Sequence, residues 1–309
     1  MALGCEPLGG TDWGAVDEAA AMDAVVRALD RGITFFDTAD VYGLGRSETL
    51  LSKALGSRRH DVVIASKGGV RWSSPSPGTR ASTSRDASPQ YLVEAIESSL
   101  TRLRLDCLPL YYVHWPDPAT PIDDTMAALD RARTQGKIRH VGVSNFSASQ
   151  IEAAHACIPL AAVQMEYSLL RRTADTELLP TCRRLGLGVV AFGALAQGLL
   201  TGKYGAASRF GKNDRRGRLP HFHGAGLHRA LEHVVAVRHS AETGGRTPAQ
   251  IAIRWVLETP GIACAIVGAK NAAQVEDNVA ACAWAMDRPE YQRLAQQPVG
   301  CGEQQSETT

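Results

Sequence analysis

The stretch Ile33–Thr38, which reads ITFFDT, is a short apolar run that ends in polar residues. Its β-branched and aromatic side chains are typical of a buried strand. Before it, Met22, Val25 and Leu29 recur at the spacing of one helix face, and Gly32 follows as a stop signal. A helix therefore leads into a strand, which is the repeating unit of α/β proteins.

The same unit recurs along the whole chain. Eight candidate strands alternate with segments of helical spacing, and they are Ala2–Cys5, Ile33–Thr38, Val62–Ser66, Leu108–His114, His140–Val143, Ala161–Met165, Gly188–Phe192 and Ile262–Val267. Several helices also begin with clear signals. Ser147 and Thr247 each stand three residues before a glutamine, which predicts a capping box at both places.

Strands that alternate with helices form either an open doubly wound sheet or a closed barrel. An open dinucleotide-binding sheet needs a G-x-G-x-x-G motif directly after its first strand. The string Gly43-Leu44-Gly45 stands five residues beyond a strand end and lacks the third glycine. Eight repeats favour a single (β/α)₈ TIM barrel over residues 1–290, and we expect a partly disordered tail over 291–309.

The composition excludes several classes of protein. Of 309 residues, 44% are hydrophobic and 21% are charged, so the chain can bury a core without disulfides or metals. A formal net charge of +1 predicts no binding to nucleic acid or membrane surfaces. Seven cysteines form no C-x-x-C pair, which predicts reduced thiols and no metal site. With no signal-peptide pattern or membrane span, we expect a cytoplasmic protein.

Polar residues follow three neighbouring candidate strands where each strand ends. Asp37 ends the second strand and Tyr42 lies in the loop after it, while Lys67 and His114 end the third and fourth. In a closed barrel these ends lie on one face, where active sites of this fold are built. Taken singly, each has an ordinary explanation as a turn former, a packed aromatic, a solvated charge or a rim histidine. Their coincidence on one face favours an active site.

This set of residues suits proton transfer near neutral pH. A free tyrosine is a sluggish acid, with a pKa of about 10. We expect the ammonium of Lys67 to lower the pKa of Tyr42, and the carboxylate of Asp37 to hold the ammonium in place. His114 can donate a hydrogen bond to a substrate oxygen. The group would stabilise negative charge that develops on a carbonyl oxygen during its reduction.

Several strings, in this order and spacing, resemble the signatures of the aldo-keto reductase family. They are FFDTADVYG (35–43), SKG (66–68), HWPD (114–117), GVSNF (142–146), VQMEY (163–167), GLLTGKY (198–204), GAK (268–270) and QVEDN (274–278). The resemblance runs from about residue 3 to about residue 285. It implies that Tyr42 is the general acid in reduction, assisted by Lys67 and Asp37, and that His114 orients the carbonyl. Family members usually carry a β-hairpin before the first strand, where this sequence starts.

The resemblance also implies a bound NADPH or NADP⁺. It assigns Ser144, Asn145 and Gln164 to the nicotinamide carboxamide and Phe192 to the ring face, where the family usually has tyrosine. It assigns the phosphates and the adenosine end to Gly193, Leu195, Gln197, Gly198, Lys203, Arg209, Gly268, Lys270, Gln274 and Asn278. A lysine at position 270 favours NADPH by charge, whereas Gln274 stands where some relatives have arginine and leaves NADH as a weaker alternative.

The expected substrate is a small polar or sugar-like carbonyl compound. Candidate substrate residues are Glu6, Trp72 and Trp115, and the acid at position 6 favours a hydroxylated molecule unless it points outward. The connection Val70–Ala87 is expected to be a mobile wall over the substrate. The basic connection Tyr204–Leu227 has three open interpretations: a loop over cofactor phosphates, a site for a phosphorylated or nucleotide-linked sugar, or a partner surface.

The sequence therefore predicts an enzyme that reduces an aldehyde or ketone to an alcohol with NADPH. Two alternatives stay open. One is reduction of a conjugated double bond in a deoxysugar precursor, and the other is a cofactor-binding, redox-sensing regulatory subunit with little turnover. Retention of Asp37, Tyr42, Lys67 and His114 weighs against the regulatory subunit. The oligomeric state and the natural substrate are not indicated by the sequence.

Overall fold

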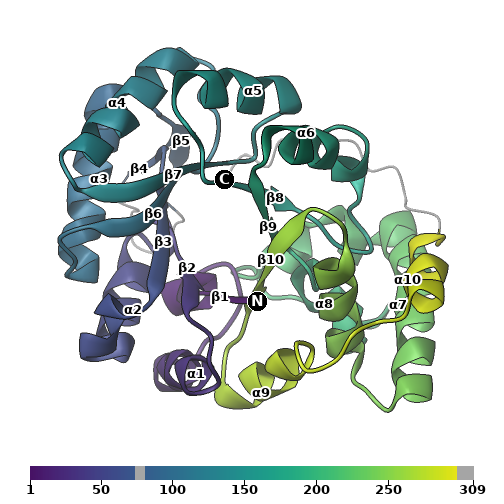
Figure 1. The fold of residues 1–309 in the computed structure, drawn as a ribbon. Helices are drawn as coiled ribbons and strands as arrows, with labels where there is room; N and C mark the ends of the chain where they lie inside the picture. The colour runs from purple at the N-terminus through teal and green to yellow at the C-terminus, as the bar shows by residue number, and fades with distance from the viewer. Residues whose placement is uncertain (74–80, 298–309) are drawn as a thin grey trace.

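Eight parallel strands close into a barrel in a computed structural model that describes residues 1–73 and 81–297 (Figure 1). The order around the barrel is β1-β10-β9-β8-β7-β6-β3-β2. These strands are β1 (Ala2–Gly4), β2 (Phe35–Asp37), β3 (Val63–Gly68), β6 (Leu108–Val113), β7 (Ile138–Ser144), β8 (Ala162–Glu166), β9 (Gly188–Phe192) and β10 (Ile262–Gly268). The closed barrel confirms the predicted fold, and each of the eight predicted strands lies at its expected place.

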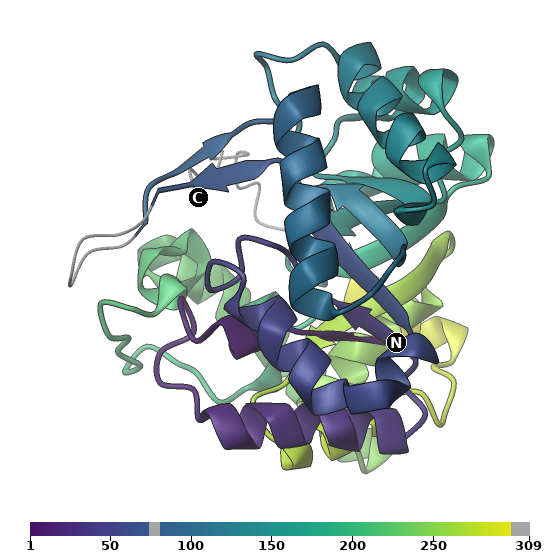
Figure 2. The same ribbon diagram turned by 90° about the vertical axis from the view of Figure 1, so that its left-hand side faces the viewer.

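Helices surround the barrel, and most of them connect one strand to its neighbour (Figures 1 and 2). They are α1 (Glu18–Asp30), α2 (Arg46–Leu55), α3 (Pro89–Leu103), α4 (Ile122–Thr134), α5 (Ala148–Cys157), α6 (Leu178–Leu185), α7 (Gly224–Gly244), α8 (Pro248–Glu258), α9 (Ala272–Ala280) and α10 (Arg288–Ala295). Short 3₁₀ helices are η1 (Glu6–Gly9), η2 (Gly56–His60), η3 (Thr173–Asp175), η4 (Ala196–Thr201), η5 (Arg215–Arg218) and η6 (Pro220–Phe222). The predicted capping boxes at Ser147 and Thr247 are both present.

The core has two layers, as expected where side chains alternate between the two faces of each strand. The inner layer fills the barrel and includes Ala65, Leu110, Tyr112 and Val190. The outer layer is a larger cluster between the strands and the helices. Because side chains fill the interior, it is a packed core, and active sites of this fold are built at the carboxyl ends of the strands. Of the helices in the described ranges, none combines the length and apolar character that a bilayer crossing requires.

Two parts of the connection Val70–Ala87 form a hairpin. Strand β4 (Val70–Trp72) pairs antiparallel with β5 (Thr83–Arg85), and together they form a hairpin that projects from the barrel (Figure 2). Arg71 Nε donates to Asp86 Oδ2 at 2.8 Å near the base of this hairpin. Residues 74–80, between the two strands, lie outside the described residues.

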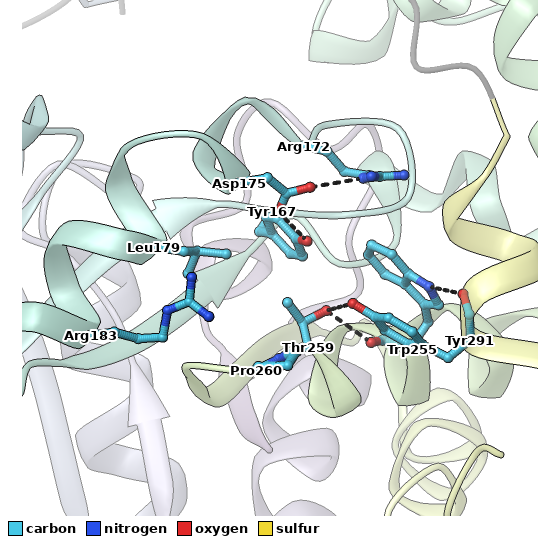
Figure 3. A pocket seen from close by; sticks show the side chains of 9 residues that line it. All are labelled: Tyr167, Arg172, Asp175, Leu179, Arg183, Trp255, Thr259, Pro260 and Tyr291. Atoms are coloured by element: carbon cyan, nitrogen blue, oxygen red, sulfur yellow. Dashed lines mark hydrogen bonds and ion pairs between the residues drawn. The ribbon is translucent and has the colours of Figure 1, made fainter. Parts of the chain in front are cut away.

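Helix α10 crosses residue 290, the predicted end of the barrel domain. The ring of Tyr291 stacks on Trp255 of α8 at 5.3 Å, and Trp255 stacks on Tyr167 at 5.7 Å (Figure 3). Leu294 is only 1% exposed. The packed domain therefore extends past the predicted boundary, because α10 packs on α8. Residues 298–309 of the expected tail lie outside the described residues.

A cavity of about 180 Å³ lies beside these stacked rings (Figure 3). Its lining residues come from η3, α6, α8, α10 and the flanking turns. The acidic residue among them is Asp175. Asp175 Oδ1 accepts a hydrogen bond from the Tyr167 hydroxyl at 2.7 Å. None of the four predicted catalytic residues lines this cavity, which is therefore separate from the site that they form.

Candidate active site

The four residues predicted to carry the chemistry come together at one end of the barrel. Asp37 is the last residue of β2, Lys67 lies near the end of β3, and His114 directly follows β6. Because β2, β3 and β6 are parallel neighbours, their carboxyl ends meet at the same rim. Tyr42 reaches this rim from the turn between β2 and α2.

Lys67 is the centre of the group. Its Nζ donates to Asp37 Oδ1 at 2.6 Å and to the carbonyl oxygen of Thr38 at 2.8 Å, and it lies 3.4 Å from the hydroxyl oxygen of Tyr42. The side chains of Lys67 and Asp37 are 0% and 4% exposed. A buried ammonium requires such partners, since desolvation of an unpaired charge is costly. The ion pair therefore holds the ammonium beside the phenol.

A close backbone approach fixes the turn that carries Tyr42. Gly43 has φ +60°, and a Cβ atom there would stand 2.2 Å from the carbonyl oxygen of Gly9. Only glycine fits both this conformation and this space. The contact packs helix η1 against the turn, so the residues after β1 form one wall of the site.

The pKa of Tyr42 is shifted in the direction opposite to the prediction. Burial raises the pKa of the Tyr42 phenol well above its ordinary value, the carboxylates of Glu6 and Asp37 raise it further, and Arg215 lowers it. Burial is the largest cause of this shift, and the carboxylate of Asp37, 2.6 Å from Lys67 Nζ, also raises the pKa of Tyr42. A phenol that retains its proton is suited to donate it.

His114 is shifted toward its neutral form. Burial lowers the pKa of His114 well below its ordinary value, and the charges of Lys67 and Arg215 lower it further. The rings of His114 and Tyr42 meet edge to face, with their centroids 5.8 Å apart. A neutral imidazole beside the phenol can donate one hydrogen bond to a carbonyl oxygen without adding a charge.

Two of the residues predicted to hold the carboxamide connect directly to this group. Gln164 Nε2 donates to Asp37 Oδ2 at 2.8 Å. Asn145 Nδ2 donates to the carbonyl oxygen of His114 at 3.0 Å and lies 3.2 Å from Ser144 Oγ. The predicted carboxamide residues therefore lie at the same end of the barrel as the predicted catalytic residues.

Phe192, which is predicted to stack on the nicotinamide, ends β9 and packs against the inner core layer. The predicted phosphate segment follows it and has an unusual backbone. Helix η4 comes after Gly193 and Leu195, and within it Gln197 and Gly198 have φ values of 53° and 92°. Positive φ at a residue other than glycine is strained and is typical of ligand-binding loops.

The predicted adenosine residues lie at the end of β10 and in α9. Lys270 Nζ donates to the carbonyl oxygen of Trp13, and Gln274 Oε1 accepts from the backbone amide of Lys270 at 2.9 Å. Gly268 is the last residue of β10, and Asn278 is buried in α9. The hydrogen bond between them places Lys270 and Gln274 beside each other.

The two cations predicted to share the phosphates differ in their surroundings. Lys203 Nζ lies 5.1 Å from the ring centroid of Tyr204. Arg209 instead donates to the carbonyl oxygens of Ala206 and Ser208 in its own loop. The Arg209 side chain is thus held by its own loop.

Arg216 belongs to the basic connection Tyr204–Leu227, and its contacts have no counterpart among the sequence predictions. Arg216 is 6% exposed and forms an ion pair with Asp214 at 2.5 Å. Its guanidinium lies over the rings of Trp13, Tyr204 and Phe210. Trp13 is about two hundred residues earlier in the chain, so no local pattern could have indicated this contact.

The candidate substrate residues lie in three different segments, η1, the β4–β5 hairpin and the turn after β6. Glu6 Oε1 accepts from Arg215 Nη1 at 2.9 Å, so its carboxylate does not point away from the protein. The Arg85 guanidinium lies 4.8 Å from the ring centroid of Trp115, which links that ring to the hairpin. Trp72 is paired opposite Thr83 within the hairpin.

A closed barrel that gathers a phenol, an imidazole and a buried ammonium–carboxylate pair at its strand ends has the arrangement of an acid–base barrel enzyme. The family model described as the Aldo/keto reductase family matches residues 1–297. The chain belongs to the aldo-keto reductase family. It is therefore an oxidoreductase that acts on carbonyl and alcohol groups.

Similar proteins cover nearly the whole barrel. Aldo-keto reductase YhdN of Bacillus subtilis (strain 168) is 36% identical over 279 residues, which are 89% of this chain and 82% of that protein. The glycerol dehydrogenase AKR11B4 of Gluconobacter oxydans has a TM-score of 0.87 and 34% identity, over 95% of this chain and 89% of that one. The holo form of aldo-keto reductase AKR11C1 of Bacillus halodurans has a TM-score of 0.78 and 28% identity, over 98% and 94%. Family members generally bind nicotinamide cofactors.

Proposed function

We propose that the protein reduces a small polar aldehyde or ketone to an alcohol with NADPH, and that Tyr42 donates the proton. The observation that carries the proposal is the position of the Tyr42 hydroxyl, 3.4 Å from the buried ammonium of Lys67 and beside the ring of His114. Both groups can stabilise an oxygen that gains negative charge. The raised pKa of Tyr42 supports a donor that is protonated at neutral pH.

The residues present fit a phosphorylated dinucleotide. Lys270 and Arg216 donate to the same carbonyl oxygen, that of Trp13, while Lys203 and Arg216 both lie 5.1 Å from the ring centroid of Tyr204. Burial and the charge of Arg216 lower the pKa of Lys203 and of Lys270. Bound phosphate groups would stabilise these three gathered cations, since the carboxylate of Asp214 balances only one positive charge.

When bound, the cofactor supplies the hydride that reduces the carbonyl carbon. The chain's own residues do the rest: His114 orients the carbonyl oxygen, and Tyr42 gives its proton to that oxygen as the alcohol forms. Lys67 lies beside the tyrosine oxygen when it becomes negative, and Asp37 holds Lys67 in that place. Excess positive charge at the proposed phosphate site favours NADPH over NADH, which stays the weaker alternative.

The rate of reduction should depend little on pH over a wide range. Reduction needs protonated Tyr42, whose pKa is raised well above 10, and neutral His114, whose pKa is lowered well below 6.5. Tyr42 should therefore lose its proton only above this interval of pH, and His114 should gain a proton only below it. With saturating NADPH, we expect kcat to vary less than about twofold from roughly pH 6.5 to 9.5. The assignment would be contradicted if kcat of the wild type fell with a midpoint below about pH 9 and kcat of Tyr42→Phe did not.

The proposed function is tested by following NADPH and NADH absorbance with aldehydes, keto sugars, cyclic ketones and an enone. We expect alcohol products and a kcat/KM at least about tenfold higher with NADPH, the size of effect that a lost charged contact produces. Product analysis by mass and NMR distinguishes an alcohol from a saturated ketone. Tight cofactor binding without reduction of any compound would instead support a regulatory protein.

A further inference from the structure

Glu6 and Arg215 form an ion pair at the rim of the active site. Arg215 Nη1 lies 2.9 Å from Glu6 Oε1, although the two residues are more than two hundred positions apart in the chain. Their side chains are 26% and 24% exposed, so the pair is partly shielded and still accessible. The backbone amide of Arg215 donates to the carbonyl oxygen of Asp12 at 2.8 Å, and its guanidinium lies over the Trp13 ring at 5.5 Å. These contacts fix the orientation of the arginine.

The pair lies close to the residues that would contact a substrate carbonyl. Glu6 opens η1, and the amide of the preceding Cys5 donates to the carbonyl oxygen of Asp37 at 2.8 Å. The close backbone approach described above holds the same helix against the Tyr42 turn. The charge of Glu6 raises the pKa of Tyr42, and the charge of Arg215 lowers the pKa of both Tyr42 and His114. Both charges therefore act at the reacting end of the site.

We propose that Glu6 and Arg215 select the substrate, and that they favour neutral carbonyl compounds with a hydroxyl group near the carbonyl. The proposal rests on the function proposed above. A carboxylate accepts a hydrogen bond from a hydroxyl, and Arg215 holds that carboxylate in place. A substrate with its own carboxylate would be repelled by Glu6 or would have to separate the ion pair. A site built to bind a hydroxyl also discriminates against an analogue that lacks it.

Three aldehydes separate these effects: glyceraldehyde, propanal and succinic semialdehyde. For each, kcat/KM is measured with saturating NADPH in wild type, Glu6→Gln and Arg215→Gln. The matched control is Glu152→Gln, which removes one partner of the exposed Arg184–Glu152 ion pair on the outer helices. Comparison of ratios between variants cancels differences in aldehyde hydration. Thermal unfolding of each variant shows whether the fold is retained.

We expect Glu6→Gln to lower the glyceraldehyde-to-propanal ratio of kcat/KM about tenfold, mainly through KM, and to raise the succinic semialdehyde-to-propanal ratio. Arg215→Gln should lower the first ratio and also lower the second, because the carboxylate of Glu6 is left uncompensated. Glu152→Gln should change neither. If Glu6→Gln scales all three aldehydes equally, the selection proposal is overturned while the proposed function stands. If wild type reduces none of them and no member of the wider panel, the proposed function itself fails.

Discussion

Tyr42→Phe is expected to lower kcat for carbonyl reduction by about 10²- to 10⁴-fold, which is the usual contribution of a positioned general acid. The variant retains the aromatic ring and loses only the hydroxyl that lies 3.4 Å from Lys67 Nζ. Because Tyr42 is not one of the proposed cofactor residues, the dissociation constant for NADPH should change less than about threefold. Steady-state NADPH absorbance measures the first quantity, and fluorescence titration measures the second.

Tyr91→Phe is the matched control. It removes a phenol hydroxyl that donates to the carbonyl oxygen of Val70 at 2.8 Å, outside the active site. We expect this control to retain kcat within a few-fold, because the partner of the Tyr91 hydroxyl is a backbone carbonyl rather than a reacting residue. Its loss should cost only about 1 kcal/mol of stability. Turnover by Tyr42→Phe equal to that of Tyr91→Phe would remove Tyr42 from the mechanism.

Lys67→Met is expected to lower the free energy of unfolding by about 3–5 kcal/mol and to reduce kcat at least about 100-fold. The large loss of stability arises because the substitution leaves the Asp37 carboxylate buried without its ammonium partner. Gln164 still donates a hydrogen bond to this carboxylate but does not neutralise its charge. Urea unfolding followed by circular dichroism measures the stability. Arg184→Met, which breaks an exposed ion pair, should cost under about 1 kcal/mol.

The double variant Asp37→Asn/Lys67→Met separates stability from catalysis. It removes both buried charges, so we expect it to recover at least half of the stability lost in Lys67→Met. Its kcat should remain as low as that of Lys67→Met, because the ammonium beside Tyr42 is still missing. Recovery of activity together with stability would show that Lys67 acts only through folding.

The barrel and the grouping of its polar residues could be predicted from local patterns. Strand ends in a parallel barrel share one face. The grouping of Asp37, Lys67 and His114 could therefore be predicted from their positions at the ends of predicted strands. The helix across residue 290 was not predicted, because α10 offers few apolar residues besides Tyr291 and Leu294. Its stability comes from packing on α8, which a local pattern does not show.

Electrostatic relations were less predictable than positions. The net shift of the Tyr42 pKa is opposite to the predicted one, because burial is its largest cause and the carboxylates of Glu6 and Asp37 raise it further. Contacts between distant segments, such as those of Glu6 with Arg215, have no signal in a single sequence. The partners of side chains in loops could therefore be found only in the structure.

The order of strands around the barrel divides the site into two contiguous arcs. The strands β1, β2, β3 and β6 are neighbours, and these strands and the segments after them carry the proton-transfer residues together with Glu6, Trp72 and Trp115. The strands β7 to β10 and the segments after them carry the proposed cofactor residues and Arg215. A hybrid of two related enzymes that are joined near α4 would thus take its proton-transfer residues from one parent and its proposed cofactor residues from the other. Such a hybrid would have to preserve two contacts between the halves: the hydrogen bond from Gln164 to Asp37 and the ion pair of Arg215 with Glu6.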